Sequence, residues 1–512
     1  MREVIIGLDV GTTSTKAVAF ALDSSRRSVV IRKYPLLHPG PLQYTQDPMV
    51  ILEAAASALA ECVQTTEGAK VLAVSVSAAM HGLMALDGNW QPLTPLVTWA
   101  DGRAGDEIVA LERIGMTLDL QASTGAALHP MTPFAKLLWF ARHDRDVSSK
   151  ARLWVGLKDY LLYWLSGSFV TELSSASGTG LLDLVTRSWS SLALDLCGLQ
   201  PSQLPEILST TSTLRLAAEV AYALGLPVGT PVCVGAGDGP LANLGSGATE
   251  PGVAGLSLGT SGALRVAVDG PSPDRHGSLF CYALADPLWV VGGATSNGAD
   301  VLRWVGSTSG LDSLVAEDSD AVALELAAGV NAGSDGLVML PFLLPERSPL
   351  WDPYLAGAFV GLRQDHTLAH QVRAGIEGVC MQMSLILDRL SSRYPIRCIR
   401  ATGGAFRSQL WAELMAAALD RPLYIVSEAE GSALGAAVLG LVAIGEVSSY
   451  DDAFTALHCN GVDSASPVSC APELVDAFRD IRSRVPDLLG SLARATSHAR
   501  TIMTDSSRGG RC

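Results

Sequence analysis

The sequence predicts an α/β protein built from two domains of similar topology, on the basis of chain length and one repeated pattern. The chain has 512 residues, of which 48% are hydrophobic, so it is too long for one core and has ample apolar content for two. Residues 4–20 and 251–268 share the order apolar stretch, small polar turn, apolar stretch. Repetition about half a chain apart indicates two copies of one fold. We expect domains at 1–246 and 247–490 and a disordered tail at 491–512.

The first copy of the pattern predicts a strand, a tight turn and a second strand. The turn consists of Gly11, Thr12, Thr13 and Ser14, whose backbone N–H groups and hydroxyls can converge on an anion. Asp9 precedes the turn. A carboxylate beside a phosphate cradle is reasonable when Mg²⁺ lies between them, held largely through water. An ordinary hairpin with a glycine in its turn is the alternative interpretation.

The second copy favours the phosphate interpretation because it repeats both the turn and its flanking strands. Its turn consists of Gly259, Thr260 and Ser261. Two such hairpins predict two domains that face each other across a nucleotide-binding cleft. A later strand ends at Gly403 and Gly404, where a backbone without side chains can lie against a flat ring or a phosphate.

Charge and cysteine content narrow the class of partner. The net charge of −15 argues against a nucleic-acid surface, so a few placed cations must bind any anionic substrate. The nine cysteines are scattered and indicate reduced thiols. No targeting segment is evident, and the longest uncharged apolar run, residues 431–445, is shorter than the roughly 20 residues of a membrane span. We expect a cytoplasmic protein with neither a nucleic-acid nor a membrane partner.

The first half contains the residue types that bind a polyol. Met80 and His81 lie at a break between two predicted strands, and Trp99, Asp101 and Arg103 share one turn shortly afterwards. Carboxylates accept hydrogen bonds from paired hydroxyls, His and Arg donate them, and an indole covers the apolar face of a sugar. A histidine satisfied by local contacts and a helix start capped by the aspartate are the alternatives.

Three further residues complete the candidate set. Asp238 follows an apolar strand and has glycine on both sides, so its carboxylate can act as a general base toward an attacking hydroxyl; a simple Asp-Gly turn is the alternative. His129 lies in a loop before two prolines, and Lys158 begins a helix. An open-chain sugar acid needs a cation for its carboxylate, and His81, Arg103, His129 and Lys158 are the candidates.

These motifs, in this order, resemble the FGGY carbohydrate kinases of the actin-like ATPase superfamily over about residues 4–446. Residues 131–143 look like the first family signature, and residues 346–362 look like the second. The resemblance implies two RNase H-like domains around a central cleft, ATP and Mg²⁺ as cofactors, and a small-molecule sugar or sugar acid as substrate. It leaves a homodimer open.

The resemblance also implies roles for individual residues. It makes Asp238 the catalytic base and Asp9 the carboxylate on the Mg²⁺ side. The two hairpin turns become the phosphate loops, with Gly403 and Gly404 against the nucleotide. Met80 and His81 match the family's substrate motif.

Within the family, the motifs are most similar to those of gluconate kinases, at residues 77–81, 98–103, 128–133, 156–160 and 280–284. Ala79 stands where xylulose kinases usually have Gln. Two positions depart from the gluconate kinase pattern, because Gly102 replaces the usual Asn and Gly237 replaces a common Ser. We expect phosphorylation of D-gluconate to 6-phosphogluconate. A xylulose or other ketose or polyol kinase is one alternative, and an actin-like or chaperone-like ATPase is another.

Overall fold

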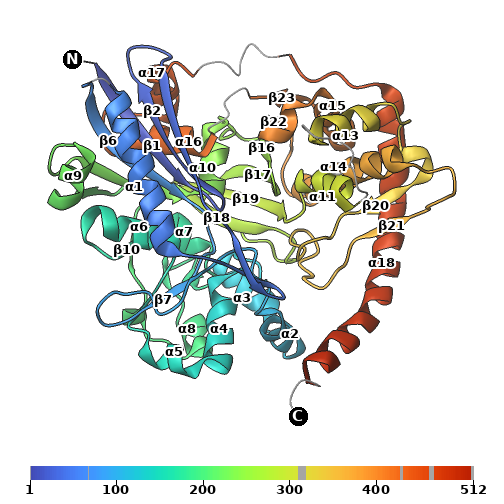
Figure 1. Ribbon diagram of the computed structural model, residues 1–512, viewed down its shortest axis with the longest axis horizontal. Helices are drawn as coiled ribbons and strands as arrows, with labels where there is room; N and C mark the ends of the chain where they lie inside the picture. Colours follow the sequence, from blue (N-terminus) through green and yellow to red (C-terminus); the bar gives the residue numbers. More distant parts are fainter. Residues whose placement is uncertain (1, 67, 309–318, 427–430, 460–465, 509–512) are drawn as a thin grey trace. The chain divides into compact units, whose positions relative to one another are not determined.

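The computed structural model describes residues 2–66, 68–308, 319–426, 431–459 and 466–508, with side chains as far as residue 492. The chain forms two compact units (Figure 1). The first consists of Met1–Pro251, Arg265–Val291 and Glu428–Ser464, and the second of Gly252–Leu264, Gly292–Ser427 and Ala465–Cys512. Both units are discontinuous, whereas the sequence predicts continuous domains at 1–246 and 247–490.

The first unit contains a six-stranded sheet with the order β14-β15-β6-β1-β2-β3. Its strands are β14 (Thr213–Arg215), β15 (Pro231–Gly237), β6 (Lys70–Ala78), β1 (Glu3–Val10), β2 (Ser14–Ala21) and β3 (Arg27–Lys33). Strand β1 pairs antiparallel with β2, as the hairpin pattern predicts, and parallel with β6. Strand β6 in turn pairs parallel with β15. The carboxyl ends of β1, β6 and β15 therefore lie at one edge of the sheet.

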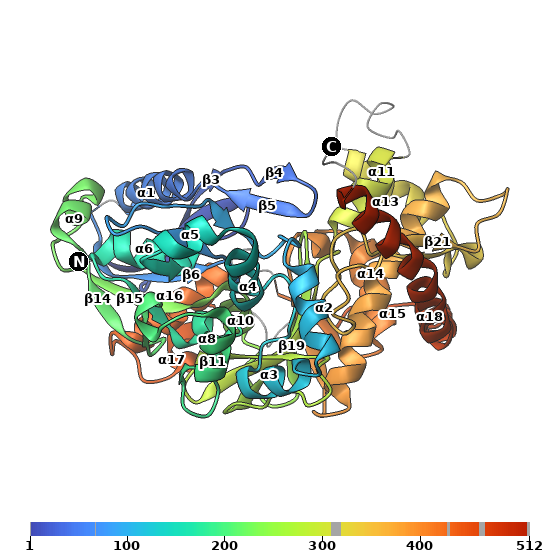
Figure 2. The same ribbon diagram turned by 90° about the horizontal axis from the view of Figure 1, so that it is seen from below.

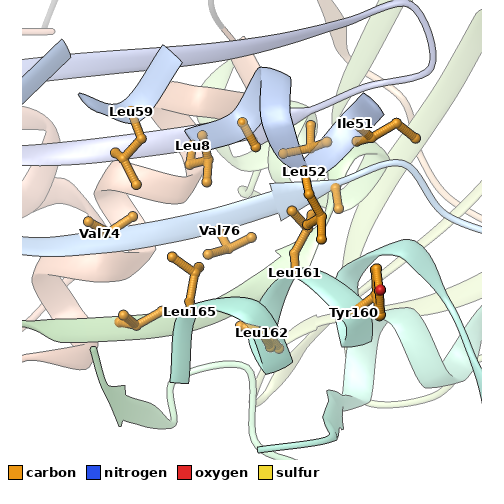
Figure 3. Packing of buried hydrophobic residues seen from close by; sticks show 14 of the residues in the cluster. Leu8, Ile51, Leu52, Leu59, Val74, Val76, Tyr160, Leu161, Leu162 and Leu165 are labelled. Carbon is orange, nitrogen blue, oxygen red and sulfur yellow. The ribbon is translucent and has the colours of Figure 1, made fainter. Parts of the chain in front are cut away.

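One face of this sheet is covered by α1 (Pro48–Thr65) and α6 (Leu157–Ser166) (Figure 3). Helix α1 begins directly after Asp47, which caps it by accepting a hydrogen bond from the Met49 N–H at 2.9 Å. The core between the helices and the sheet is formed by buried side chains that include Leu8, Ile51, Leu59, Val76 and Leu161. This layer fixes the strands whose ends carry the candidate site.

The other face of the sheet packs against α16 (Gly431–Ala443), which contacts both β1 and β6. Small residues allow this close approach, and the stretch Ala433–Leu441 is buried throughout. The sequence analysis places α16 in the second domain, within residues 247–490. The structure places it in the first unit, because its small-residue face fits the strand backbones there.

Helix α10 (Asp238–Gly245) packs on α16 so closely that their backbones meet. A Cβ atom at Gly435 of α16 would overlap the carbonyl of Leu241 and approach Gly245 N within 3.1 Å. Ser432 Oγ also donates to the Asp238 carbonyl oxygen at 3.1 Å. This contact therefore holds the start of α10, where the predicted catalytic base lies.

The second six-stranded sheet has the order β18-β19-β17-β16-β22-β23. Its strands are β18 (Phe280–Ala285), β19 (Leu288–Thr295), β17 (Gly262–Asp269), β16 (Val253–Leu258), β22 (Cys398–Thr402) and β23 (Leu423–Ile425). Strand β16 is followed by β17 and pairs parallel with β22 on its other side. This repeats the arrangement of β1, β2 and β6, so the repeated sequence pattern corresponds to a repeated local topology.

Shorter elements complete the two units. Small sheets are formed by β4 (Leu37–Gly40), β5 (Gln43–Gln46) and β8 (Leu96–Val97), by β7 (Met84–Leu86) with β9 (Leu153–Val155), by β10 (Val170–Glu172) with β13 (Glu206–Leu208), by β11 (Leu182–Asp183) with β12 (Ser188–Trp189), and by β20 (Val338–Leu340) with β21 (Ala358–Val360). The other helices are α2 (Gly105–Arg113), α3 (Thr117–Thr124), α4 (Pro133–His143), α5 (Arg145–Lys150), α7 (Leu173–Ser177), α8 (Ser191–Cys197), α9 (Ala218–Leu224), α11 (Asp300–Thr308), α13 (Ser319–Ala328), α14 (Leu368–Ser391), α15 (Gln409–Leu419) and α17 (Tyr450–Ala456).

Helix α18 (Pro472–Arg508) continues into the segment 491–512, for which the sequence predicts disorder (Figures 1 and 2). Phe478, Ile481 and Val485 are buried on one face of α18, and these anchored turns let the helix propagate to Arg508. The last four residues of the expected tail, 509–512, lie outside the described residues. Within the described part of the chain, no helix is both long and apolar enough to cross a membrane.

The contact between α10 and α16 predicts a specific sensitivity to added volume. Gly435→Ala should lower the free energy of unfolding by about 1–3 kcal/mol, because the added methyl group overlaps the α10 backbone. Thermal unfolding followed by fluorescence measures this loss. Gly88→Ala, in an exposed turn with open space around the glycine, is the control. Equal midpoints for the two variants would contradict the packing described.

Candidate active site

Strand register brings three polar side chains of the first unit to one edge of the sheet. Asp9 lies opposite Ser77, and Gly237 lies opposite Ala78. Ser77 Oγ donates to Asp9 Oδ1 at 2.8 Å. Asp238 follows β15 directly, and its Oδ1 accepts from the N–H of the next residue at 2.7 Å. The sequence-predicted Mg²⁺ ligand and catalytic base therefore share this edge.

Desolvation makes the ionised form of Asp9 unfavourable. It is the main cause that raises the pKa of Asp9 to about 6, and repulsion from Asp238 raises it further. The hydrogen bond from Ser77 and the more distant charges of Lys16 and Lys158 act in the opposite direction. A desolvated carboxylate near a second carboxylate is stabilised when a cation lies close by.

The first hairpin turn is held by contacts that the sequence analysis did not identify. Gly11 N donates to Ser14 O at 3.0 Å and closes the turn. Tyr34 Oη donates to Gly11 O at 2.7 Å, and Gln46 Nε2 donates to Thr12 O at 2.6 Å. Thr13 is exposed at the tip. The turn is thus fixed from its outer side by residues from the following strands.

Trp99 belongs to this hairpin as much as to the predicted sugar site. Its Nε1 donates to Thr12 Oγ1 at 2.8 Å. This bond joins the first phosphate turn to the segment that contains Asp101 and Arg103. Trp99 therefore links two groups of residues that the sequence presents as separate motifs.

His81 adopts a left-handed backbone conformation, with φ of 66°. This conformation costs a residue with a side chain about 1–3 kcal/mol, so the surroundings must enforce it. The Nδ1–H of His81 donates to Gly178 O at 2.8 Å, and its ring lies 5.6 Å from the ring of Tyr282. The other ring nitrogen, Nε2, is then the one that can face a ligand.

Met80 fills the space beside Gly237. A Cβ atom at Gly237 would lie 2.6 Å from Met80 Cγ, so the Ser that is common here in the family would displace Met80. Glycine at position 237, in place of the usual Ser, therefore allows Met80 of the predicted substrate motif to pack here.

Asp101 and Arg103 form a bidentate ion pair. Arg103 Nε and Nη2 each donate to the Asp101 carboxylate at 2.8 Å, and Tyr44 N donates to the same carboxylate at 2.8 Å. The guanidinium also lies 5.1 Å from the Trp139 ring centre. The carboxylate is 1% exposed. Its main effect is therefore to orient Arg103. Asp101 does not cap a helix, because α2 begins after Ala104 without a side-chain cap, so the helix-start alternative is wrong.

His129 is buried, and its Nδ1 accepts from Met131 N at 3.2 Å. This bond assigns the ring proton to Nε2, since the nitrogen that accepts carries no hydrogen. The imidazole of His129 is thus held in one tautomer by the backbone of its own loop.

Lys158 is bound by the backbone. Its Nζ donates to the carbonyls of Val76, Val234 and Ala236 at 2.8, 3.0 and 2.6 Å, and it lies 3.5 Å from Glu172 Oε1. Burial lowers the pKa of Lys158. Its three N–H groups have backbone partners, which favours a positioning role over the substrate contact that the sequence predicts.

A second chain of contacts begins at Glu172 and reaches the peptide before Asp238. The buried carboxylate of Glu172 accepts from Ser174 N at 2.5 Å and from Ser175 N at 3.0 Å. Ser174 Oγ in turn accepts from Gly237 N at 3.2 Å. Ser174 therefore links the carboxylate of Glu172 to the backbone of β15.

In the second unit, the second hairpin turn and the glycine pair lie at one sheet edge. Strands β16 and β22 are parallel neighbours, with Ser257 opposite Thr402, so Gly259 and Gly403 each follow an adjacent strand end. Gly259 N donates to Ser261 O at 2.9 Å, and Gly298 N donates to Thr260 O at 2.9 Å. Gly404 has open space around its Cα, which suits the predicted approach of a nucleotide.

Comparison with known proteins decides the family. The family model for the N-terminal domain of the FGGY carbohydrate kinases matches residues 4–245, and that for the C-terminal domain matches residues 254–444. The chain belongs to the FGGY family of carbohydrate kinases. Membership sets aside the alternative of an actin-like or chaperone-like ATPase. It also identifies the protein as a phosphotransferase, and kinases of this family use ATP as the phosphate donor.

Relatives of this FGGY kinase match it along nearly its whole length. Gluconokinase from Bacillus subtilis (strain 168) is 33% identical, with 99% of both chains covered. Gluconate kinase from Lactobacillus acidophilus superposes with a TM-score of 0.87 at 30% identity, covering 97% of this chain and 100% of that one. Xylulose kinase from the same organism gives 0.87 at 31%, covering 97% and 99%. The predicted two-domain α/β fold is confirmed.

The pH at which kcat/KM for ATP falls on the acidic side should depend on Ser77. Ser77→Ala removes a donor that stabilises the ionised form of Asp9, so the pKa of Asp9 should rise above 6. The limb in kcat/KM for ATP should move to higher pH by about one unit, with little change at pH 8.5. Ser75→Ala, on the same strand and face, is the control. An unshifted limb in Ser77→Ala would contradict the need for ionised Asp9.

Proposed function

We propose that this FGGY kinase transfers phosphate from ATP to the terminal hydroxyl of an open-chain sugar acid, converting D-gluconate to 6-phosphogluconate. The observation that carries this choice is the Arg103 guanidinium, which is held in one orientation by Asp101 and Trp139. A fixed guanidinium suits a carboxylate, which it can bind through paired hydrogen bonds. A neutral ketose has no such group.

The identity of the relatives supports the same substrate. A full-length relative is a gluconokinase, and the net charge of −15 makes placed cations necessary for an anionic sugar. Two further cationic or donor groups, His81 and His129, come from the same unit as Arg103. With Lys158 occupied by backbone carbonyls, these three residues are the remaining candidates from the sequence for the sugar acid.

Asp238 is proposed as the general base. Its carboxylate would take the proton of the terminal hydroxyl as that oxygen attacks the γ-phosphate, and its Oδ1 also accepts from Gly239 N at 2.7 Å. The contacts of α10 with α16 and of Gly237 with Ser174 fix where this carboxylate points. Alignment of the hydroxyl and exclusion of water then contribute most of the rate.

The residues at the sheet edge fit an Mg²⁺ ion. Asp9 supplies a hard oxygen ligand, and its desolvation beside Asp238 makes a cation favourable there. Among the residues that the structure describes, no group of three or more His, Cys, Asp and Glu side chains forms a metal cage. Such a site suits Mg²⁺, which usually keeps several waters. Once bound, the ion would neutralise charge on the transferred phosphate. The hairpins Gly11–Ser14 and Gly259–Ser261 would hold the phosphates of ATP.

A xylulose kinase is the second candidate. The gluconate kinase and the xylulose kinase from Lactobacillus acidophilus resemble this chain to the same degree, so overall similarity does not separate the two substrates. The choice of D-gluconate therefore depends on the carboxylate site.

A sugar panel tests the substrate. With ADP release as the readout, kcat/KM for D-gluconate should exceed that for D-xylulose by at least about tenfold, the equivalent of one charge-assisted contact. Arg103→Gln should reduce this ratio, and a ratio is insensitive to any loss of active protein. A preference for D-xylulose in the wild type would overturn the proposal, and so would a ratio that Arg103→Gln leaves unchanged.

The role of Asp238 has its own test. Asp238→Asn should lower kcat by about 10²- to 10⁴-fold while leaving the Kd for ATP within about twofold, because the amide cannot take the proton. Asp195→Asn, on the exposed side of α8, is the control and should behave like the wild type. Turnover near normal in Asp238→Asn would exclude this residue as the base.

A further inference from the structure

Lys136 is a fully buried cation that the proposed mechanism does not use. It lies on α4, is 0% exposed, and its Nζ donates to His81 O at 2.5 Å and to Met131 O at 2.7 Å. The charges of Asp101 and Arg103 act on the same ammonium. Three segments proposed for the sugar, at residues 80–81, 101–103 and 129–131, therefore meet around one side chain.

Each backbone contact of Lys136 adjoins a histidine of the proposed sugar site. The carbonyl of His81 belongs to the residue with the left-handed backbone, whose ring is fixed on Gly178 O. The backbone of Met131 is held on both sides, since its carbonyl accepts from Lys136 while its N–H donates to Nδ1 of His129. Lys136 thus connects the two loops that orient the imidazoles of His81 and His129.

Stability does not explain this lysine. Burial lowers the pKa of Lys136 to about 7. A lysine whose pKa is lower in the folded state than in the unfolded chain opposes folding at neutral pH, because the unfolded chain binds the proton more tightly. An apolar side chain of similar length would avoid that penalty. The ammonium of Lys136 is therefore better explained by the two backbone carbonyls that it orients, those of His81 and Met131.

We propose that Lys136 is a positioning residue for sugar binding, which ties the carbonyls of His81 and Met131 together and so sets the placement of the His81 and His129 imidazoles. This inference rests on the proposed sugar site but not on which sugar occupies it. Without the ammonium, the His81 peptide loses a partner that holds its left-handed conformation, and the two loops can separate. The ATP-binding hairpins do not depend on this contact.

The test compares Lys136→Met with Leu138→Ala, a core variant on the same helix whose apolar side chain lies in the hydrophobic cluster and can donate no hydrogen bond to either loop. Each is assayed with the best sugar of the wild-type panel. Lys136→Met should raise KM for that sugar by about tenfold or more, with KM for ATP changed by less than about twofold. Leu138→Ala should lower the midpoint of thermal unfolding without raising KM for the sugar selectively over KM for ATP.

A double-mutant cycle tests whether Lys136 acts through His81. In a His81→Ala background, Lys136→Met should raise the sugar KM by less than about threefold, because one of the two imidazoles that it positions is gone. An equal effect in both backgrounds would overturn the proposal, as would an unchanged sugar KM in the single variant. A wild type that phosphorylates no sugar would instead refute the proposed function, so the two failures are distinguishable.

Discussion

The ammonium of Lys158 fastens the carboxyl ends of β6 and β15, and the candidate site of the first unit depends on this contact. Three carbonyls from the two strands converge on one nitrogen, with Glu172 close by as its counter-charge. Parallel strands have no tight turn to set the relative position of their ends. A buried cation bound to both ends supplies that constraint, and it places Asp238 on the same edge as Asp9.

Buried charge is used twice in this unit, in two different ways. Lys158 has Glu172 beside it and acts on the strands, whereas Lys136 has only carbonyls as hydrogen-bond partners and acts on the loops. Both side chains are costly to desolvate. The carbonyls that each ammonium binds offset part of that cost. Lys158 thus holds the sheet edge and Lys136 holds the loops proposed for the sugar, in both cases through hydrogen bonds to backbone carbonyls.

The sheet edge that carries Asp9 and Asp238 is acidic, in contrast to the two buried lysines. Asp9 is partly exposed, and desolvation together with repulsion from Asp238 raises its pKa to about 6, so the protein alone does not fully stabilise its charge. A site in this condition favours a cation-bound substrate such as nucleotide with Mg²⁺, since the ion supplies the missing positive charge. The hydrogen bond from Ser77 lowers the pKa of Asp9 but does not cancel the effects of desolvation and of Asp238.

The sequence by itself determined the two hairpin turns, the α/β class and the family. These features are local, because turn residues and strand alternation act over a few positions. They also placed Asp9 near the end of its strand and Asp238 directly after its own. The motifs at 131–143 and 346–362 identified the family but did not indicate what Lys136 contacts.

Only the tertiary structure decided which partners the charged residues have and which unit each segment joins. Lys158 binds carbonyls 76 to 82 positions away, Arg103 is oriented by Asp101 and Trp139, and α16 packs on the first sheet despite its position late in the chain. Such contacts depend on which surfaces fit together at close range. No pattern of neighbouring residues encodes that fit, so the chain shows where a cation lies but only the fold shows what it binds.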